Sequence, residues 1–312
     1  MMSDLVILSG PTAVGKSSLA VRLAQKIGGS IISADSMQVY KGMDIGTAKI
    51  TKEEMGDIPH YLIDVLDPAD DFNIVTFKNM AVSAIHDIYE KGRIPIIVGG
   101  TGFYIQSVLY DIDFTENKEM PDYRDELMRL IEDKGPGFVH DMLKEADPDA
   151  ALHIHPNDSK RMIRALEYNR QTGKMLSEHN RKCMQNISPY NFCYFVLTDK
   201  RELIYDRINA RVDKMIKDGL VDEVRFLVEA GLTKENVSMH ALGYKEIIDF
   251  LEGNTTLDEA VSIIKRDSRH FAKRQLTWFR REKEVYWLDL QNGTDVLDEI
   301  MIELKRKGII NG

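Results

Sequence analysis

The chain has 312 residues, of which 43% are hydrophobic and 29% charged, and its formal net charge is −9. This composition excludes collagen-like, low-complexity and largely disordered chains, and the length allows about two domains. Cys183 and Cys193 lack CxxC spacing, so they predict neither a disulfide framework nor a zinc site. Because no segment resembles a signal peptide or a membrane span, we expect a cytoplasmic protein without a membrane partner. The acidic balance argues weakly against a nucleic-acid partner.

Short apolar, β-branched or aromatic runs alternate with helix-spaced apolar positions along most of the chain. Strands are predicted over residues 4–9, 30–33, 60–65, 94–98, 192–197 and 285–290. Helices are predicted over residues 16–27 and 75–91, and again over 201–217, 221–230, 241–250 and 256–281. Apolar strands joined by helices predict an α/β fold with a parallel sheet flanked by helices on both faces.

The alternation stops in the middle of the chain, where no strand pattern occurs. Helices are predicted there over residues 121–133, 137–146 and 157–171, separated by Pro- and Gly-containing breaks. We therefore expect a helical insertion domain at 113–190. It would separate the first part of the core, 1–112, from the remainder of the core with its C-terminal helices, 191–312.

A phosphate-binding loop follows the first predicted strand and opens the first helix. The sequence GPTAVGKS at 10–17 matches G-x-x-x-x-G-K-[ST] in the context that the motif requires. Its backbone N–H groups, the helix N-terminus and the lysine attract phosphate oxygens, and the Ser17 hydroxyl can ligate Mg²⁺. The alternative is a Gly-rich turn that only caps a helix. The motif predicts a P-loop NTPase-like core that binds a diphosphate or triphosphate through Gly10, Thr12, Ala13, Val14, Gly15, Lys16 and Ser17.

The strand predicted at 94–98 ends in Gly99-Gly100-Thr101-Gly102, without the strand-end aspartate typical of NTP-hydrolysing enzymes. The other candidate, Asp64 in the strand predicted at 60–65, follows few apolar residues. The pattern disfavours a motor or switch ATPase and favours a single transfer from a phosphate-bearing donor. Thr101 lies at the carboxyl end of its strand, where ligands of open α/β sheets bind, although it could equally serve the turn.

Asp35 ends the strand predicted at 30–33 and is expected at the same edge of the sheet. Its carboxylate could accept a proton from a nucleophile or help to hold Mg²⁺ through water. Aspartate is also a common turn residue, so position alone leaves both interpretations open. The following segment, 38–49, has no helix or strand period and is expected to form a substrate-recognition loop.

Taken together, several motifs resemble the signature of the tRNA dimethylallyltransferases, also called tRNA isopentenyltransferases, most closely the bacterial type. In chain order they are GPTAVGKS at 10–17, DS and QVY within 35–40, GMDIGTAK at 42–49, VGGT at 98–101, HPND at 155–158 with Arg161 and Arg164, ALGY at 241–244 and KRQLTW at 273–278. The likeness covers nearly the whole chain, up to about residue 290.

The resemblance implies transfer of a dimethylallyl group from dimethylallyl diphosphate to the N6 amine of the adenine adjacent to the tRNA anticodon, with release of diphosphate. It implies that the P-loop holds the leaving diphosphate, with Mg²⁺ on Ser17. Asp35 would be the base, Thr101 would lie near the reacting end of the donor, and Arg211 would neutralise the departing diphosphate. Further expected tRNA contacts, beside Asp35 and Thr101, are Ser36, Met37, Gln38, Arg124, Lys160, Arg161, Arg164, Lys273 and Arg274.

Two segments oppose the overall acidic charge, since residues 160–182 and 265–284 each carry a net charge of +5. Aromatic side chains are interleaved with the second segment, a combination that suits RNA. A single basic helix is more often a solvated face, but two such segments beside the family resemblance favour binding of RNA, which the resemblance implies to be the tRNA anticodon arm. The protein is expected to be a monomer. Because a stacked base cannot reach the P-loop, we expect the adenine to be flipped out.

Two other functions compete with this interpretation. A P-loop kinase of a nucleoside or another small metabolite would use the same loop and an aspartate base. A non-catalytic RNA-binding P-loop protein would not depend on Asp35. The GMDIGTAK segment, the acid-free GGT turn and the two basic segments favour the transferase.

Overall fold

A computed structural model describes residues 3–114, 120–183, 186–293 and 295–311. Its contacts divide the chain into two compact units. One comprises residues 1–109 and 189–312, and the other comprises residues 110–188. The first unit holds every strand that the structure describes, and the second is built from helices. Each unit is described separately below.

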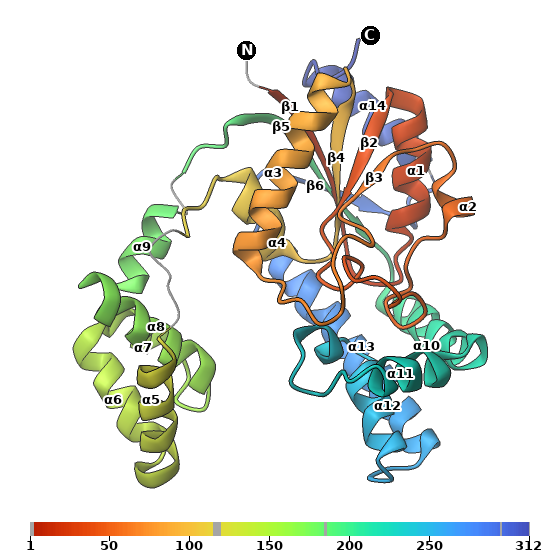
Figure 1. Ribbon diagram of the computed structural model, residues 1–312. Coiled ribbons are helices and arrows are strands. Elements are labelled where there is room, and N and C mark those ends of the chain that lie inside the picture. Colours follow the sequence, from red (N-terminus) through yellow and green to blue (C-terminus); the bar gives the residue numbers. More distant parts are fainter. Residues whose placement is uncertain (1–2, 115–119, 184–185, 294, 312) are drawn as a thin grey trace. The chain divides into compact units, whose positions relative to one another are not determined.

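The first unit is centred on a six-stranded sheet in the order β3-β2-β4-β1-β5-β6, and every pair of neighbouring strands is parallel (Figure 1). This confirms the predicted parallel α/β fold. All carboxyl ends of the strands therefore meet at one edge, where Ser9 of β1 pairs with Gly99 of β4. The strands are β1 (Ser3–Ser9), β2 (Gly29–Ser33), β3 (His60–Tyr61), β4 (Ile94–Gly99), β5 (Tyr190–Thr198) and β6 (Val285–Asp289).

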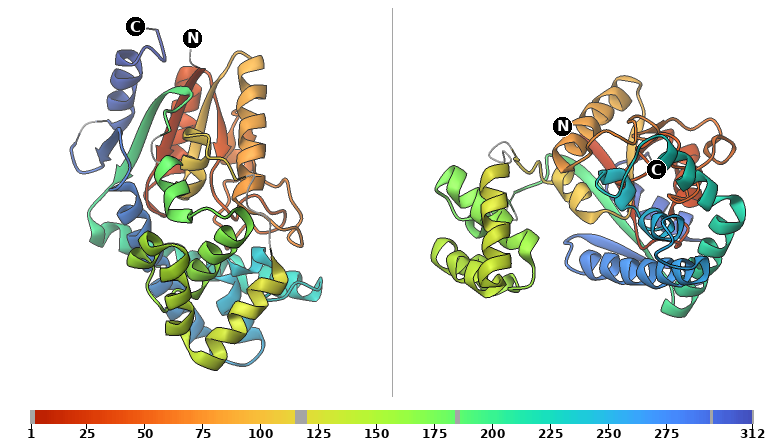
Figure 2. Two further views of the ribbon diagram at one scale, coloured as in Figure 1. Left: turned by 90° about the vertical axis from the view of Figure 1, so that its left-hand side faces the viewer. Right: turned by 60° about the horizontal axis from the view of Figure 1, so that its bottom comes forward.

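Helices cover both faces of the sheet, as the apolar strands require. α1 (Lys16–Ile27) and α14 (Val296–Arg306) lie on one face, and α3 (Ile74–Glu90) and α4 (Gly102–Leu109) lie on the other (Figures 1 and 2). β1 is buried between them, because its side chains from Leu5 to Leu8 are fully inaccessible to solvent. Cys193 of β5 is a fully buried core side chain, and this burial raises the pKa of its thiol to about 12.

The helices from α10 to α13 gather below the sheet in Figure 1, near the carboxyl ends of its strands. α13 packs against both α10 and α12, and its Ala272 and Phe279 are buried. The apolar face of this basic helix therefore belongs to the core, and only its charged side faces solvent. These elements are α10 (Arg201–Asp218), α11 (Leu220–Glu229), the 3₁₀ helix η1 (Val237–His240), α12 (Tyr244–Leu251) and α13 (Leu257–Phe279).

Two predicted elements of this unit differ in the structure. The strand predicted at 60–65 ends at Tyr61, because Leu62 and Asp64 have positive φ angles of 63° and 54°, outside the β region. The helix predicted at 241–250 begins only at Tyr244, since Gly243 with φ of 103° precedes it as the cap. The short helix α2 (Lys52–Met55) was not predicted because it has no apolar periodicity. A capping box between Thr51 and Glu54 stabilises its first turn.

The second unit consists of α5 (Pro121–Lys134), α6 (Pro136–Ala146), α7 (Pro148–His153), α8 (Ser159–Thr172) and α9 (Leu176–Cys183). Leu127, Val139, Leu143 and Met162 form its core together with neighbouring apolar side chains. The buried Asp147 caps α7 by accepting from the Ala150 N–H at 3.0 Å. Asp147 also accepts from the Ser177 hydroxyl and N–H, which ties α9 to α7. The sequence pattern did not predict these two short helices.

A buried carboxylate joins α8 to α5 in this unit. Glu167 is fully buried, and Arg124 donates to its two oxygens from Nε at 3.0 Å and from an Nη at 2.8 Å. The fork of the guanidinium matches the carboxylate and compensates its burial. Arg124 therefore has a structural function in this unit, and its contact with RNA remains a prediction.

Within the described ranges, no helix is both long and apolar enough to cross a membrane.

Arg124→Ala is expected to destabilise the helical unit by about 2 kcal/mol, because it leaves the Glu167 carboxylate buried without its cation. Limited proteolysis and thermal unfolding would measure the loss. Arg129→Ala removes an exposed arginine of the same helix and should leave both unchanged. An equal response of the two variants would show that the ion pair does not stabilise the unit.

Candidate active site at the carboxyl edge of the sheet

The P-loop connects β1 to α1 through backbone conformations that few residues adopt. Gly10 and Gly15 have φ angles of 144° and 97°, and Ala13 is also left-handed at 61°. A Cβ atom on Gly10 would lie 2.7 Å from the carbonyl oxygen of Leu197, so only glycine fits there. The loop is therefore shaped by close approach to β5 as well as by the turn itself.

Two cations lie against this loop. The Lys16 ammonium donates to the carbonyl oxygens of Gly10 at 3.0 Å and of Pro11 at 2.8 Å. Arg211 of α10 also contacts the loop and donates to the Thr12 hydroxyl at 3.2 Å. Burial, followed by the charge of Arg211 and opposed by Asp35, lowers the pKa of Lys16 to about 7. Burial also lowers the pKa of Arg211. Two partly desolvated cations that repel each other form a site for an anion such as diphosphate.

Gln275 of α13 ties the P-loop to the end of β4. The Thr12 N–H donates to its Oε1 at 2.8 Å, and its Nε2 donates to the Gly100 carbonyl at 3.0 Å. Gln275 is only 6% exposed, and a Cβ on Gly100 would overlap its amide. The sequence motif around Gln275 predicts family membership and RNA contacts at Lys273 and Arg274, but it does not predict this role of Gln275. Thr101, which is half-buried, follows the glycine that Gln275 holds.

Asp35 follows β2 and faces the same edge. Its Oδ1 accepts from the Met37 N–H at 2.9 Å, which fixes the turn and orients the carboxylate. Its charge acts on both Lys16 and Arg211, so the three groups lie within electrostatic range of one another. Burial, then the neighbouring Tyr40 and Asp35, raises the pKa of Tyr104 to about 12, so that phenol remains a neutral neighbour.

An open cleft, whose volume is about 410 Å³ when the solvent at its mouth is included, lies between Lys16 and Asp35. Lys16, Ser17, Asp35 and Gln38 give it a polar side. Its other wall is largely apolar and includes Ala20, Ile31, Ile50, Ile63 and Val98. The cleft therefore combines a phosphate-attracting end, a carboxylate and an apolar surface, the mixture expected of a small-ligand site.

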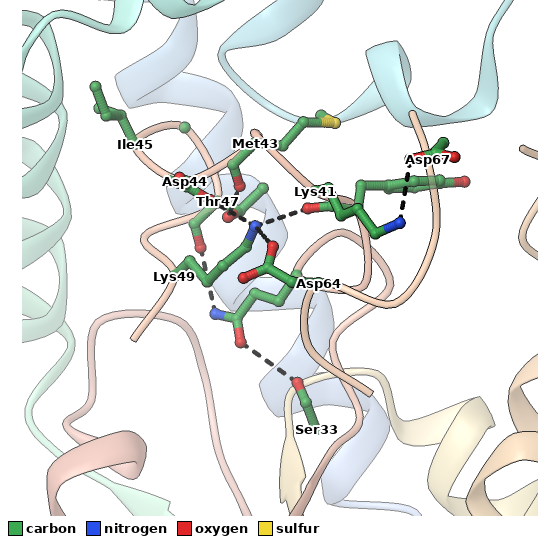
Figure 3. A network of polar contacts seen from close by, with 12 residues as sticks. Ser33, Lys41, Met43, Asp44, Ile45, Thr47, Lys49, Asp64 and Asp67 are labelled. Carbon is green, nitrogen blue, oxygen red and sulfur yellow. Dashed lines mark hydrogen bonds and ion pairs between the residues drawn. The ribbon is translucent and has the colours of Figure 1, made fainter. Parts of the chain in front are cut away.

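The segment predicted as a recognition loop is ordered by its own polar contacts (Figure 3). The Lys49 ammonium, only 4% exposed, donates to the Tyr40 carbonyl and to Asp44, both at 2.6 Å, and to Asp64 at 2.5 Å. Asp64 thus neutralises a lysine and does not occupy a strand end as a metal-binding acid would. The contact agrees with the shortened strand, which ends at Tyr61 before the left-handed Leu62 and Asp64.

The matched family models are described as IPP transferase, over residues 38–282, and isopentenyl transferase, over residues 3–68. A relative named tRNA dimethylallyltransferase from Lachnoclostridium phytofermentans is 55% identical over 99% of this chain and all of its own length. The chain belongs to the IPP transferase family. A second such relative, from Carboxydothermus hydrogenoformans, is 49% identical over 100% of this chain and 99% of its own length. The resemblance inferred from the motifs is confirmed.

Solved structures of related transferases share the fold. The tRNA isopentenylpyrophosphate transferase of Bacillus halodurans is 44% identical, with a TM-score of 0.74 over 98% of both chains. A eukaryotic dimethylallyltransferase, solved acting on tRNA, is 30% identical with a TM-score of 0.83, over 98% of this chain and 79% of that one. The P-loop-like parallel sheet is therefore common to this transferase and its relatives.

The predicted RNA-contacting residues of this transferase divide between its two units. In the sheet unit, Lys273 and Arg274 are exposed on α13 beside the buried Gln275. In the helical unit, Lys160 and Arg161 are exposed on the first turn of α8, where Arg161 lies 3.4 Å from Asp158. Arg164 is half-buried on the same helix, and Ser36, Met37 and Gln38 are half-buried near the cleft. All of these RNA contacts remain predictions.

The lowered pKa of Lys16 predicts a pH dependence for anion binding in this transferase. A lysine with a pKa of about 7 is charged below that pH and loses its charge as the pH rises. The affinity for inorganic diphosphate, measured by calorimetry from about pH 6 to about pH 9, is therefore expected to fall above about pH 7, by up to about tenfold per unit. The matched variant Lys16→Met corrects for titration of diphosphate itself. A constant ratio between wild type and variant across this range would contradict the prediction.

Proposed function

We propose that this chain transfers a dimethylallyl group from dimethylallyl diphosphate to N6 of the adenine adjacent to the anticodon of a tRNA, with release of diphosphate. The observation that carries this proposal is that Lys16 and Arg211 both bond to the P-loop, within electrostatic range of the Asp35 carboxylate. The cations suit a diphosphate leaving group, and the carboxylate suits an attacking amine. The names of the relatives and the eukaryotic structure acting on tRNA support the same substrates.

In the proposed reaction, the adenine N6 attacks the first carbon of the dimethylallyl group and forms a C–N bond. The bond from that carbon to the diphosphate oxygen breaks, and the oxygen keeps the electron pair. Lys16, Arg211 and the N–H groups of the loop stabilise the charge that grows on the diphosphate. Asp35 accepts the proton that the amine loses.

The apolar wall of the cleft supports a place for the prenyl chain. Ile31, Ile50 and Val98 offer the donor a hydrocarbon surface beside the P-loop. Thr101 follows the β4 end that adjoins this wall, and its place near the reacting end of the donor stays a prediction. Holding both reactants in one cleft lowers the entropic part of the barrier.

The donor set at the P-loop fits Mg²⁺. The Ser17 side chain is exposed and lines the cleft beside Lys16, and Mg²⁺ usually combines one or two protein ligands with phosphate oxygens and water. Within the described residues there is no cluster of three His, Cys, Asp or Glu side chains for a dedicated metal cage. Ser17 and the diphosphate would hold the ion, and Asp35, which lines the same cleft, would assist through water. When bound, the ion would neutralise charge on the leaving group.

Labelled dimethylallyl diphosphate, incubated with the protein and bulk tRNA, is expected to transfer its label to adenosine in the RNA, as nucleoside analysis would detect. Asp35→Asn keeps the acceptor for the Met37 N–H but removes the base, so turnover should fall by about 10²-fold or more while RNA affinity persists. Asp57→Asn changes an exposed aspartate in the same way and should have no effect. Unlabelled RNA, with ATP-dependent phosphorylation of a nucleoside, would contradict the proposal.

The tRNA anticodon arm is the proposed partner of the basic residues, with the target adenine flipped out of its stack. Lys160→Ala and Lys273→Ala should each weaken tRNA binding and reduce the slope of log K against log salt by about one, if each lysine contacts one phosphate. Filter binding at several salt concentrations measures the slope. Lys305→Ala, an exposed lysine on α14, is the control. A slope that neither substitution changes would place both lysines away from RNA.

A further inference from the structure

A carboxylate from a distant helix lies inside the turn of the recognition loop. Glu223 of α11 accepts from the N–H groups of Asp44 at 2.8 Å and Ile45 at 2.7 Å through one oxygen. Its other oxygen accepts from the Gly46 N–H at 3.1 Å. Three successive backbone N–H groups thus converge on one anion, as in the backbone nests that bind phosphate, but here the anion is a side chain of the protein.

Tyr244 of α12 completes this arrangement. Its hydroxyl donates to the Gly46-facing oxygen of Glu223 at 2.6 Å, and the side chain is fully buried. Burial and the charge of Glu223 raise the pKa of this tyrosine, so it remains a donor. A Cβ on Gly46 would overlap the Tyr244 ring, so the loop lies directly on that ring. Glu223 and Tyr244 therefore fix both the hydrogen bonds and the position of residues 44–46.

The same loop is connected to the cleft. Gln38, which lines the cleft, donates through Nε2 to the carbonyls of Thr47 and Ala48, both at 3.4 Å. Its Oε1 accepts from the Ser33 hydroxyl at 3.3 Å, at the end of β2 and just before Asp35. The loop then returns to the cleft wall at Ile50. Glu223 thus holds residues 44–46, and the adjacent residues 47 and 48 hold Gln38, near the proposed base.

We propose that Glu223 is a positioning residue for the RNA substrate: it preforms the loop at residues 43–49, and through it Gln38, so that the cleft receives the target base without reorganisation. This inference rests on the proposed function. Glu223 contacts the loop on the Gln38 side of the cleft, whereas Lys16, Arg211 and Gln275 hold the P-loop independently of it. Loss of Glu223 should therefore weaken binding of the RNA and leave binding of the diphosphate donor unchanged.

Glu223→Gln tests this separation. Glutamine has nearly the same shape but a single acceptor oxygen, so it cannot satisfy all three N–H groups and the tyrosine hydroxyl. KM for tRNA is expected to rise about tenfold or more, because several charge-assisted bonds that order the loop are lost. KM for dimethylallyl diphosphate and the affinity for inorganic diphosphate should stay within about twofold, since the P-loop contacts persist.

Two further variants serve as a control and as a second test of the same contact. Glu229→Gln removes the same charge from an exposed site on α11 and should leave both KM values unchanged. Tyr244→Phe keeps the ring under Gly46 and removes one of four hydrogen bonds, so KM for tRNA should rise about two- to threefold. This variant carries the test if Glu223→Gln fails to fold.

Suppose that the wild type transfers the label. If Glu223→Gln then leaves KM for tRNA unchanged, or raises KM for both substrates equally, the positioning function alone is overturned. The same holds if Glu223→Gln does not fold and Tyr244→Phe leaves KM for tRNA unchanged. A wild type that binds diphosphate but transfers no label to tRNA would overturn the proposed function, and this inference with it. A selective rise for tRNA supports both.

Discussion

The convergence of Lys16 and Arg211 on the P-loop is the arrangement on which the candidate site depends. Burial lowers the pKa of both groups, which means that it disfavours their charged forms. A bound anion would stabilise both charges. The fold sustains this arrangement with rigid elements, since Lys16 begins α1 and Arg211 belongs to α10. Diphosphate, which carries its charge before and after the transfer, is the ligand that such a site favours.

Close backbone approach gives the rest of the cleft its geometry. A side chain on Gly99 would overlap Ala34, which directly precedes Asp35, and one on Gly100 would overlap Gln275. The ends of β2 and β4 can therefore come together only because β4 ends in glycines. The acid-free GGT turn, which separates this chain from hydrolytic P-loop enzymes in sequence, is thus explained by packing. At the end of β4, where hydrolytic P-loop enzymes usually have an acid, this chain has glycines because the backbones of β2 and β4 approach closely there.

The sequence predicted what periodicity and local motifs encode: the parallel sheet, the P-loop, and Asp35 at a strand end. It could not predict contacts between residues far apart in the chain. Gln275 binds Thr12 across 263 residues and Glu223 binds Asp44 across 179, and neither pair leaves a periodic signal. The strand expected through Asp64 was wrong because Lys49 attracts that carboxylate into a left-handed turn. The family resemblance predicts an RNA contact for Arg124, whereas its bond to Glu167 depends on how two helices pack.

The tie between Thr12 and Gln275 has a consequence for biosynthesis. The P-loop is among the first segments to leave the ribosome, but the amide that binds its backbone belongs to α13, in the last fifth of the chain. The nascent protein can form β1 and α1 early, yet the loop acquires its finished hydrogen bonds only after α13 has emerged and docked. Premature termination before that helix would therefore leave a chain with an intact phosphate motif and an unfinished phosphate site.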